Sequence, residues 1–181
     1  MGTSIQKLEL SEADFRGARL ANHQHDLKGN ADILCLTQPK AISRIHQEYL
    51  CAGSDIITTN TFNSTTISQK DYGLESLVKD LNFAAANIAR ESCDQWTEKT
   101  PEKPRFVAGA LGPTNKSLSL SPDINDASYR DVTFDEIYNA YLEQVEGLLE
   151  GGVDILLIET IFDTLNGKAA LMACREMLKK H

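Results

Sequence analysis

The sequence predicts an α/β fold: a partial (β/α)8 TIM barrel with about three parallel strands and their crossover helices. Three observations lead to this prediction. Segments of helical and strand character alternate, one helix-to-strand junction occurs twice, and a short apolar run follows Gly151 and Gly152. That run, Val153 to Ile158, is typical of a strand buried on both faces in a parallel sheet beneath helices.

The composition is that of one globular domain. Of 181 residues, 41% are hydrophobic and 24% are charged. The net charge of -8, with no cluster of Lys and Arg, argues against binding to nucleic acid or an anionic membrane. No apolar stretch approaches the roughly 20 residues of a membrane span, and the N-terminus has no signal-peptide core. We therefore expect a cytoplasmic protein with a small soluble partner.

The first elements are a loop, a helix and a strand. Residues 1–28 show little periodicity, so we expect a loop there, with one short helical turn capped by Ser11. Pro39 begins a helix with apolar residues at helical spacing, and Gly53 ends it. A strand over 55–60 follows directly. The next predicted element is a long helix over 74–96, which carries one apolar stripe.

The second half repeats the alternation. A strand is predicted over 106–111, and a polar loop over 114–130 follows it, longer than compact connections usually are. Thr133 and Glu136 form a capping box at the start of the next helix. After the strand that follows this helix, Asp163 and Thr164 begin a last helix, with a predicted apolar face of Leu165, Ala169, Met172 and Leu178.

The repeated junction aligns two polar residues. Leu50 to Ile57 matches Leu149 to Leu156, and five residues beyond the Asp of each copy lie Asn60 and Glu159. The ends of parallel strands face the same side of a sheet, where α/β enzymes place their sites. A carboxylate at the end of a buried strand needs a cationic partner or a polar opening, because burying it unpaired costs several kcal/mol. Glu159 is therefore predicted to bind substrate, or alternatively to form a structural ion pair.

Three strands leave two open apolar edges, which natural proteins cover or close. A barrel would close them, but eight strands typically need about 250 residues. We therefore interpret residues 1–181 as one partial domain, less than half of a barrel and truncated at both ends.

The cysteines do not indicate a metal site. They are widely and irregularly spaced and contain no C-x-x-C pair, which predicts reduced, mostly buried thiols: Cys35, Cys51, Cys93 and Cys174. His23 and His25 form an H-x-H, but no acidic or thiol cluster lies beside them in the sequence.

Several stretches closely resemble the homocysteine-binding domain of cobalamin-dependent methionine synthase, and the resemblance covers essentially the whole chain. The longest are Arg105 to Asn115 (RFVAGALGPTN) and Leu156 to Thr164 (LLIETIFDT). Shorter ones are Met1-Gly2-Thr3, Asp14 to Gly17, Leu27 to Asn30, Ala52 to Ile57, Thr59 to Phe62 and Asp71 to Glu75.

The resemblance implies a (β/α)8 barrel that binds homocysteine and zinc and takes a methyl group from methylcobalamin to give methionine. The family's zinc keeps the substrate sulfur as a thiolate, which is the nucleophile. Its three zinc-binding cysteines come from later strands, so we expect neither the zinc ligands nor the cobalamin-binding module in this chain. The implied partners are homocysteine, the remaining barrel, and the folate- and cobalamin-binding domains of a full-length enzyme.

The resemblance also implies a substrate site, whereas no catalytic residue is carried over. Glu159 would receive the amino group of homocysteine, and Asn60, Gly2 and Thr3 would lie near the amino-acid end of the substrate. Two features depart from the family. The Asp-Gly-Gly that precedes Met-Gly-Thr there is missing, and Thr58 stands where the family usually has a glutamate.

Three functional hypotheses remain open. The first is a part of a methionine synthase, inactive as an isolated 181-residue chain. The second is a stand-alone homocysteine S-methyltransferase with another methyl donor. The third is a non-catalytic truncated barrel that serves as an interaction or structural unit. The flanking sequence would discriminate them, because further strands with a G-x-N-C and a later Cys-Cys would indicate the enzyme.

Overall fold

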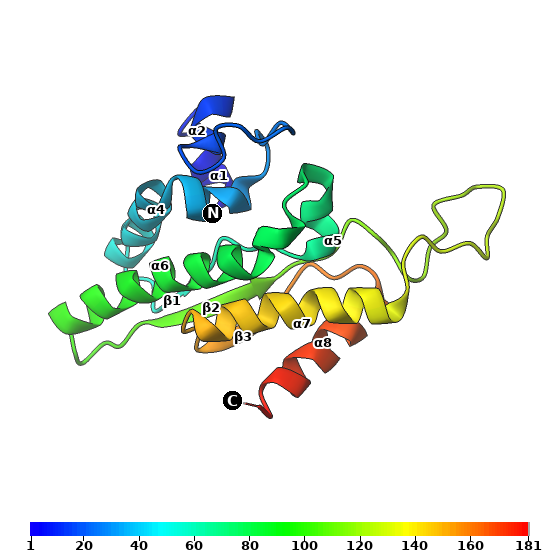
Figure 1. The fold of residues 1–181 in the computed structure, drawn as a ribbon. Coiled ribbons are helices and arrows are strands. Elements are labelled where there is room, and N and C mark those ends of the chain that lie inside the picture. The colour runs from blue at the N-terminus through cyan, green and yellow to red at the C-terminus, as the bar shows by residue number, and fades with distance from the viewer. Residues whose placement is uncertain (181) are drawn as a thin grey trace.

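One parallel sheet forms the centre of the molecule. The computed structural model describes residues 1–180, and its strands are β1 (Ile56–Thr58), β2 (Phe106–Leu111) and β3 (Ile155–Ile158). They lie in the order β1-β2-β3, so that β2 is central and the other two are edges (Figure 1). In the register, Thr58 pairs with Ala108, and Ala108 pairs with Ile155. The prediction of three parallel strands with crossover helices is confirmed.

Four long helices connect and cover these strands: α4 (Pro39–Cys51), α6 (Val78–Lys99), α7 (Phe134–Glu150) and α8 (Thr164–Met177). Shorter elements complete the described chain: α1 (Gly2–Gln6), α2 (Glu12–Arg16), η1 (Ala31–Ile33), α3 (Leu34–Thr37), α5 (Thr66–Gln69), η2 (Lys70–Tyr72) and η3 (Glu75–Leu77). The loop after β2 projects away from the body beyond the start of α7 (Figure 1).

The two faces of the sheet differ. Side chains of one face, such as Ile57 and Val107, are buried under the helices. On the other face Ile56 is 51% exposed and Ile155 is 40% exposed. The prediction that 153–158 is buried on both faces is therefore wrong. Strand β3 is an edge strand, and no element of residues 1–180 covers the outer side of Ile155.

The N-terminal segment contains more helix than predicted. Ser11 caps α2 as expected, and its hydroxyl accepts a hydrogen bond from the Asp14 backbone N–H. Helix α1 forms within the expected loop, which corrects that prediction. Ile5 and Phe15 bury themselves in one cluster with Leu27 and Ile33. Helices of five residues are too short to show an apolar period, so tertiary packing rather than pattern places them.

Helix α7 follows its prediction, whereas α8 follows it in its Asp163 N-cap and buried Ala169 but not in the rest of its apolar face. Thr133 and Glu136 form the expected capping box. In α8, however, the predicted apolar residues Met172 and Leu178 are 44% and 59% exposed. The buried face is instead made mostly of small residues, which let α8 approach α7 closely: Ala169, Ala170, Ala173, Cys174 and Met177.

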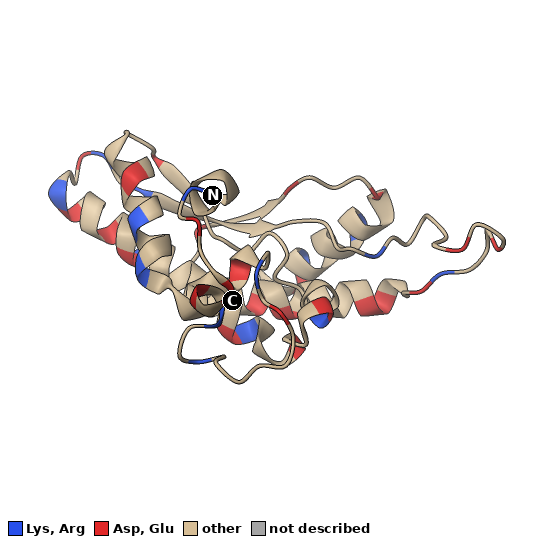
Figure 2. Ribbon diagram, turned by 90° about the horizontal axis from the view of Figure 1, so that it is seen from above, with Lys and Arg blue, Asp and Glu red and all other residues tan. Residues whose placement is uncertain are grey.

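Charged residues of both signs are interspersed along the helices (Figure 2). One ion pair fixes the start of β3: Arg90 Nη1 lies 2.8 Å from Asp154 Oδ2. The same Asp154 oxygen accepts a hydrogen bond from the Val107 backbone N–H at 2.7 Å. In residues 1–180, none of the helices combines the length and the apolar character needed to cross a membrane.

Candidate functional site

The carboxyl ends of the strands border one cavity of about 380 Å³. Asn60 reaches it from the segment after β1, Glu159 from the end of β3 and Gly2 from α1. The repeated junction in the sequence thus places its two polar residues at one cavity. The other lining residues are Met1, Ala31, Asp32, Thr58, Thr59, Thr61, Phe62, Asn63 and Ala110.

Glu159 presents an unpaired carboxylate to this cavity. Its backbone N–H donates to the Leu111 carbonyl at 3.0 Å, which continues the β3 pairing. Its side chain, half-buried, forms no hydrogen bond or ion pair within residues 1–180, unlike Asp154 at the opposite end of the strand. Thr160 follows with a φ of +57°, a left-handed conformation that is unusual for a β-branched residue. The chain thus turns sharply after Glu159.

Asn60 is fixed by contacts beneath the cavity. It is 5% exposed, and its Nδ2 donates to the Ala31 carbonyl at 2.7 Å and to the Cys35 sulfur at 3.7 Å. Its Oδ1 has no partner within residues 1–180. The side-chain donors are thus directed into the protein, whereas the acceptor remains available to a ligand.

Asp32 is a second carboxylate at the cavity, and sequence reasoning missed it. It is 3% exposed, and its Oδ2 accepts hydrogen bonds from the Asn63 backbone N–H at 2.6 Å and the Ser64 hydroxyl at 2.8 Å. Burial raises the pKa of Asp32 to about 6, although these two hydrogen bonds oppose the shift. No period or motif surrounds Asp32 in the sequence, so only the tertiary structure reveals its position.

The electrostatics of the cavity favour a cation. Its lining contains two carboxylate side chains, Asp32 and Glu159, no Lys or Arg, and Met1, the residue that carries the α-amino group. The unpartnered Asn60 Oδ1 adds a third acceptor. Three acceptor groups at one cavity suit an ammonium group, which has three donors and no acceptor.

Gly2 and Thr3 lie in different surroundings. Gly2 lines the cavity, and a Cβ added to it would meet no atom within 4 Å. Thr3 is exposed on α1 and is not part of the lining. Of the four predicted substrate-binding residues, the structure therefore brings three together.

The residues present do not fit a zinc site. Within residues 1–180, no group of three or more His, Cys, Asp or Glu side chains is placed to hold a metal ion. Cys35, Cys93 and Cys174 are buried on three different helices, and Cys51 is exposed at the end of α4. Burial raises the pKa of the Cys35 thiol, and the nearby Asp32 raises it further, which disfavours the thiolate a metal needs.

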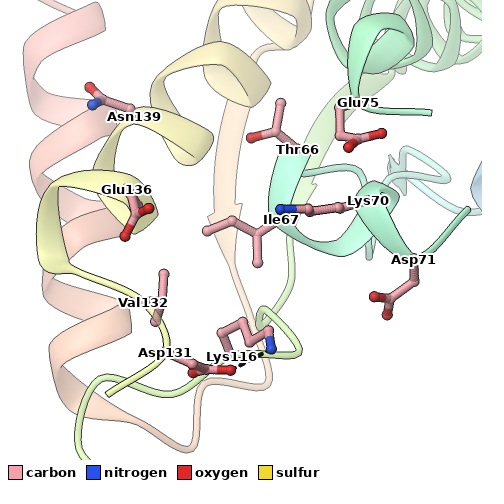
Figure 3. Close-up of a pocket in the computed structure, with 10 residues that line it drawn as sticks. All are labelled: Thr66, Ile67, Lys70, Asp71, Glu75, Lys116, Asp131, Val132, Glu136 and Asn139. Atoms are coloured by element: carbon pink, nitrogen blue, oxygen red, sulfur yellow. Dashed lines mark hydrogen bonds and ion pairs between the residues drawn. The ribbon is translucent and has the colours of Figure 1, made fainter. Parts of the chain in front are cut away.

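A larger cavity, about 600 Å³, lies elsewhere, between the α5–η2 segment and the start of α7. Figure 3 shows Lys70 and Glu136 reaching into it from opposite walls. Its remaining cation, Lys116, forms an ion pair with Asp131. The lining mixes Lys with Asp and Glu and contains none of the predicted substrate-binding residues.

A polar network holds the loop after β2. The Asp163 carboxylate accepts hydrogen bonds from the Ser117 hydroxyl at 2.6 Å, from the Ser119 hydroxyl at 2.7 Å and from two backbone N–H groups, including that of Leu165 at 2.9 Å. Burial alone would raise the pKa of Asp163, but these hydrogen bonds hold it well below its usual range. Asp163 thus both caps α8, as predicted, and ties the loop to the turn after Glu159.

The chain is similar in structure to solved homocysteine methyltransferases. The metallated form of MmuM from Escherichia coli aligns with a TM-score of 0.73 at 20% identity, over 98% of this chain and 57% of that chain. The oxidized form of the same protein aligns with a TM-score of 0.72 at 21% identity, over 97% and 56%. This chain therefore spans little more than half the length of those proteins. The match confirms the predicted partial barrel fold.

A sequence model of one family covers every residue of the chain. The model describes homocysteine S-methyltransferase, and it matches residues 1–181. It agrees with the resemblance found in the sequence and with the two structural matches. The chain belongs to the homocysteine S-methyltransferase family.

Proposed function

We propose that this chain is the homocysteine-binding part of a methyltransferase that converts homocysteine to methionine. Residues 1–181 would form one partial domain, and the remaining strands would complete the barrel. The observation that carries the proposal is the unpaired Glu159 carboxylate in an acceptor-rich cavity at the carboxyl ends of the strands. Parallel α/β proteins place their active sites at this end of the sheet.

In this proposal Glu159 binds the substrate ammonium, and Asn60 and Gly2 lie beside the amino-acid end of homocysteine. Thr3 stays a prediction, since its side chain lies on the exposed side of α1. The homocysteine sulfur attacks the methyl carbon as a thiolate. A carbon–sulfur bond forms, and the donor leaves with the electron pair of the bond that breaks. This chain orients the substrate through its charged end.

We further propose methylcobalamin as the methyl donor, as in methionine synthase, with separate folate- and cobalamin-binding domains. The support is the length of the matching stretches RFVAGALGPTN and LLIETIFDT. The alternative is a stand-alone homocysteine methyltransferase with another donor, because the chain also matches solved structures of a homocysteine methyltransferase. A protein of this family acting on a cytosolic amino acid would be cytoplasmic.

The test is methionine formation by a protein that contains the complete barrel. Homocysteine is supplied with either methylcobalamin or a methylsulfonium compound as donor, and methionine is quantified. We expect turnover with methylcobalamin. Turnover with the sulfonium donor alone would establish the stand-alone alternative, and binding of no homocysteine at all would contradict the proposed function.

A further inference from the structure

The strongest unassigned group in the molecule is the Asp32 carboxylate. It lies on η1, a short segment outside the strands, yet it lines the same cavity as Glu159. Only one of its oxygens is anchored: Oδ2 accepts from Asn63 N–H and the Ser64 hydroxyl. Oδ1 has no hydrogen-bond partner within residues 1–180, and it is not sealed from solvent. A side chain that is 3% exposed therefore directs one free acceptor into the cavity.

The hydrogen bonds by which Asp32 anchors the segment after β1 do not explain why this side chain is charged. An asparagine has the same shape, and its Oδ1 would accept both hydrogen bonds that Oδ2 of Asp32 receives. A buried carboxylate without a cation destabilises the fold relative to such an amide. The negative charge is thus unexplained by packing or by hydrogen bonding within residues 1–180, and it points to a cationic ligand.

No cation within residues 1–180 is paired with Asp32. The cavity lining contains no Lys or Arg, and its other titratable side chain is Glu159. Met1, the residue that carries the α-amino group, also lines the cavity, but that group is not paired with Asp32. Beneath the cavity lies Cys35, a neutral thiol, 3.7 Å from the Asn60 amide nitrogen. A ligand that enters must therefore supply the positive charge.

We infer that Asp32 is a second ammonium-binding residue, which shares the amino group of the substrate with Glu159 and makes the site specific for an amino acid over a simple thiol. This inference rests on the proposed function. An ammonium has three N–H donors, so it can bond to both carboxylates and to Asn60 Oδ1 at once. Thr58 faces the same cavity without a charge, which leaves Asp32 as the carboxylate supplied by the N-terminal half.

The test compares two thiols in a protein that contains the complete barrel. Homocysteine carries the ammonium, and 4-sulfanylbutanoate is the same molecule without it. Dissociation constants are measured by calorimetry for the wild type, Asp32→Asn and Ser64→Ala. We expect Asp32→Asn to raise the dissociation constant for homocysteine about tenfold or more, as for loss of one partner of a buried charge pair. The dissociation constant for 4-sulfanylbutanoate should be unchanged. Ser64→Ala, which disturbs only the anchor of Asp32, should keep the preference for homocysteine.

Three outcomes would overturn the inference. If Asp32→Asn weakened the binding of both thiols equally, Asp32 would have a structural role. If it weakened the binding of neither, Asp32 would have no role in the site. An Asp32→Asn protein that fails to fold would show that the fold itself needs the charge. Failure of the proposed function is distinct, because the wild type would then not bind homocysteine, or would bind both thiols equally.

Discussion

Asn60 and Glu159 lie at matching positions beyond β1 and β3, and both line one cavity across the end of the central strand β2. Each follows a copy of the same helix-to-strand junction, five residues after its Asp. The two copies nevertheless present different groups. Asn60 is held by Ala31 and Cys35, whereas the Glu159 side chain forms no hydrogen bond or ion pair within residues 1–180. The repeat thus provides one fixed acceptor and one charge available to a ligand.

Asp163 is expected to support both α8 and the loop after β2. Replacing it with Ala removes four hydrogen bonds to a carboxylate, so we expect a loss of roughly 3 kcal/mol in the free energy of unfolding at neutral pH. Asp135→Ala is the control, because Asp135 is exposed in the first turn of α7 and caps nothing. Denaturant unfolding measures the free energy of unfolding of both variants. Equal losses for Asp163→Ala and Asp135→Ala would contradict the stabilising role of the Asp163 network.

The pH dependence of Asp163 has a definite sign. Its pKa is lower in the folded state than the usual 3.8, so its stabilising effect is present above about pH 4 and is lost as the pH falls through the folded-state value. The difference in unfolding free energy between the wild type and Asp163→Ala should therefore shrink in acid. A difference that stays constant from pH 7 to pH 2 would contradict this assignment.

Asp32 should show the opposite behaviour. Its folded-state pKa of about 6 exceeds the usual 3.8, so the fold is favoured with Asp32 protonated, and this stabilisation is lost as the pH rises from 4 through 6. Asp32→Asn should accordingly be more stable than the wild type at pH 7.5, by roughly 1–3 kcal/mol, and equal to it at pH 3.5. Denaturant unfolding at both pH values measures this. A variant less stable than the wild type at pH 7.5 would contradict it.

Thr160 carries backbone strain beside the site. A left-handed conformation costs an L-residue roughly 1–2 kcal/mol, and glycine avoids most of this cost. Thr160→Gly, at φ +57°, should therefore stabilise the protein by about 1 kcal/mol or less. The control Thr164→Gly, in the first turn of α8, should destabilise it. If thermal unfolding shows both variants destabilised, Thr160 is not strained.

The sequence predicted the features that depend on local residue patterns. The cap at Ser11, the capping box at Thr133 and the N-cap at Asp163 are all present in the structure, because each depends on residues close together in the chain. The errors concern tertiary context. Helix α8 packs through alanines rather than through Met172 and Leu178, and periodicity alone does not show which apolar stripe a neighbour covers.

The sequence predicts the site residues that follow the repeated helix-to-strand junction, but not Asp32. The matched junctions alone predict that Asn60 and Glu159 lie at one edge of the sheet, and both line the cavity there. Asp32 lies far from Glu159 in the sequence, on a segment without a period, and is brought to the cavity by hydrogen bonds to Asn63 and Ser64. Contacts of this kind depend on the folded backbone, so a single sequence carries no sign of them.

Glu159→Gln provides the most direct test of the account. In a protein that contains the complete barrel, the amide keeps the shape and removes an unpaired charge, so the melting temperature should not fall. Homocysteine binding should weaken by an amount on the order of 2–5 kcal/mol, as for the loss of one partner of a buried charge pair. Calorimetric titration with homocysteine and a thermal melt are made on the same variant. An unchanged dissociation constant with a lowered melting temperature would contradict the account and assign Glu159 to the fold.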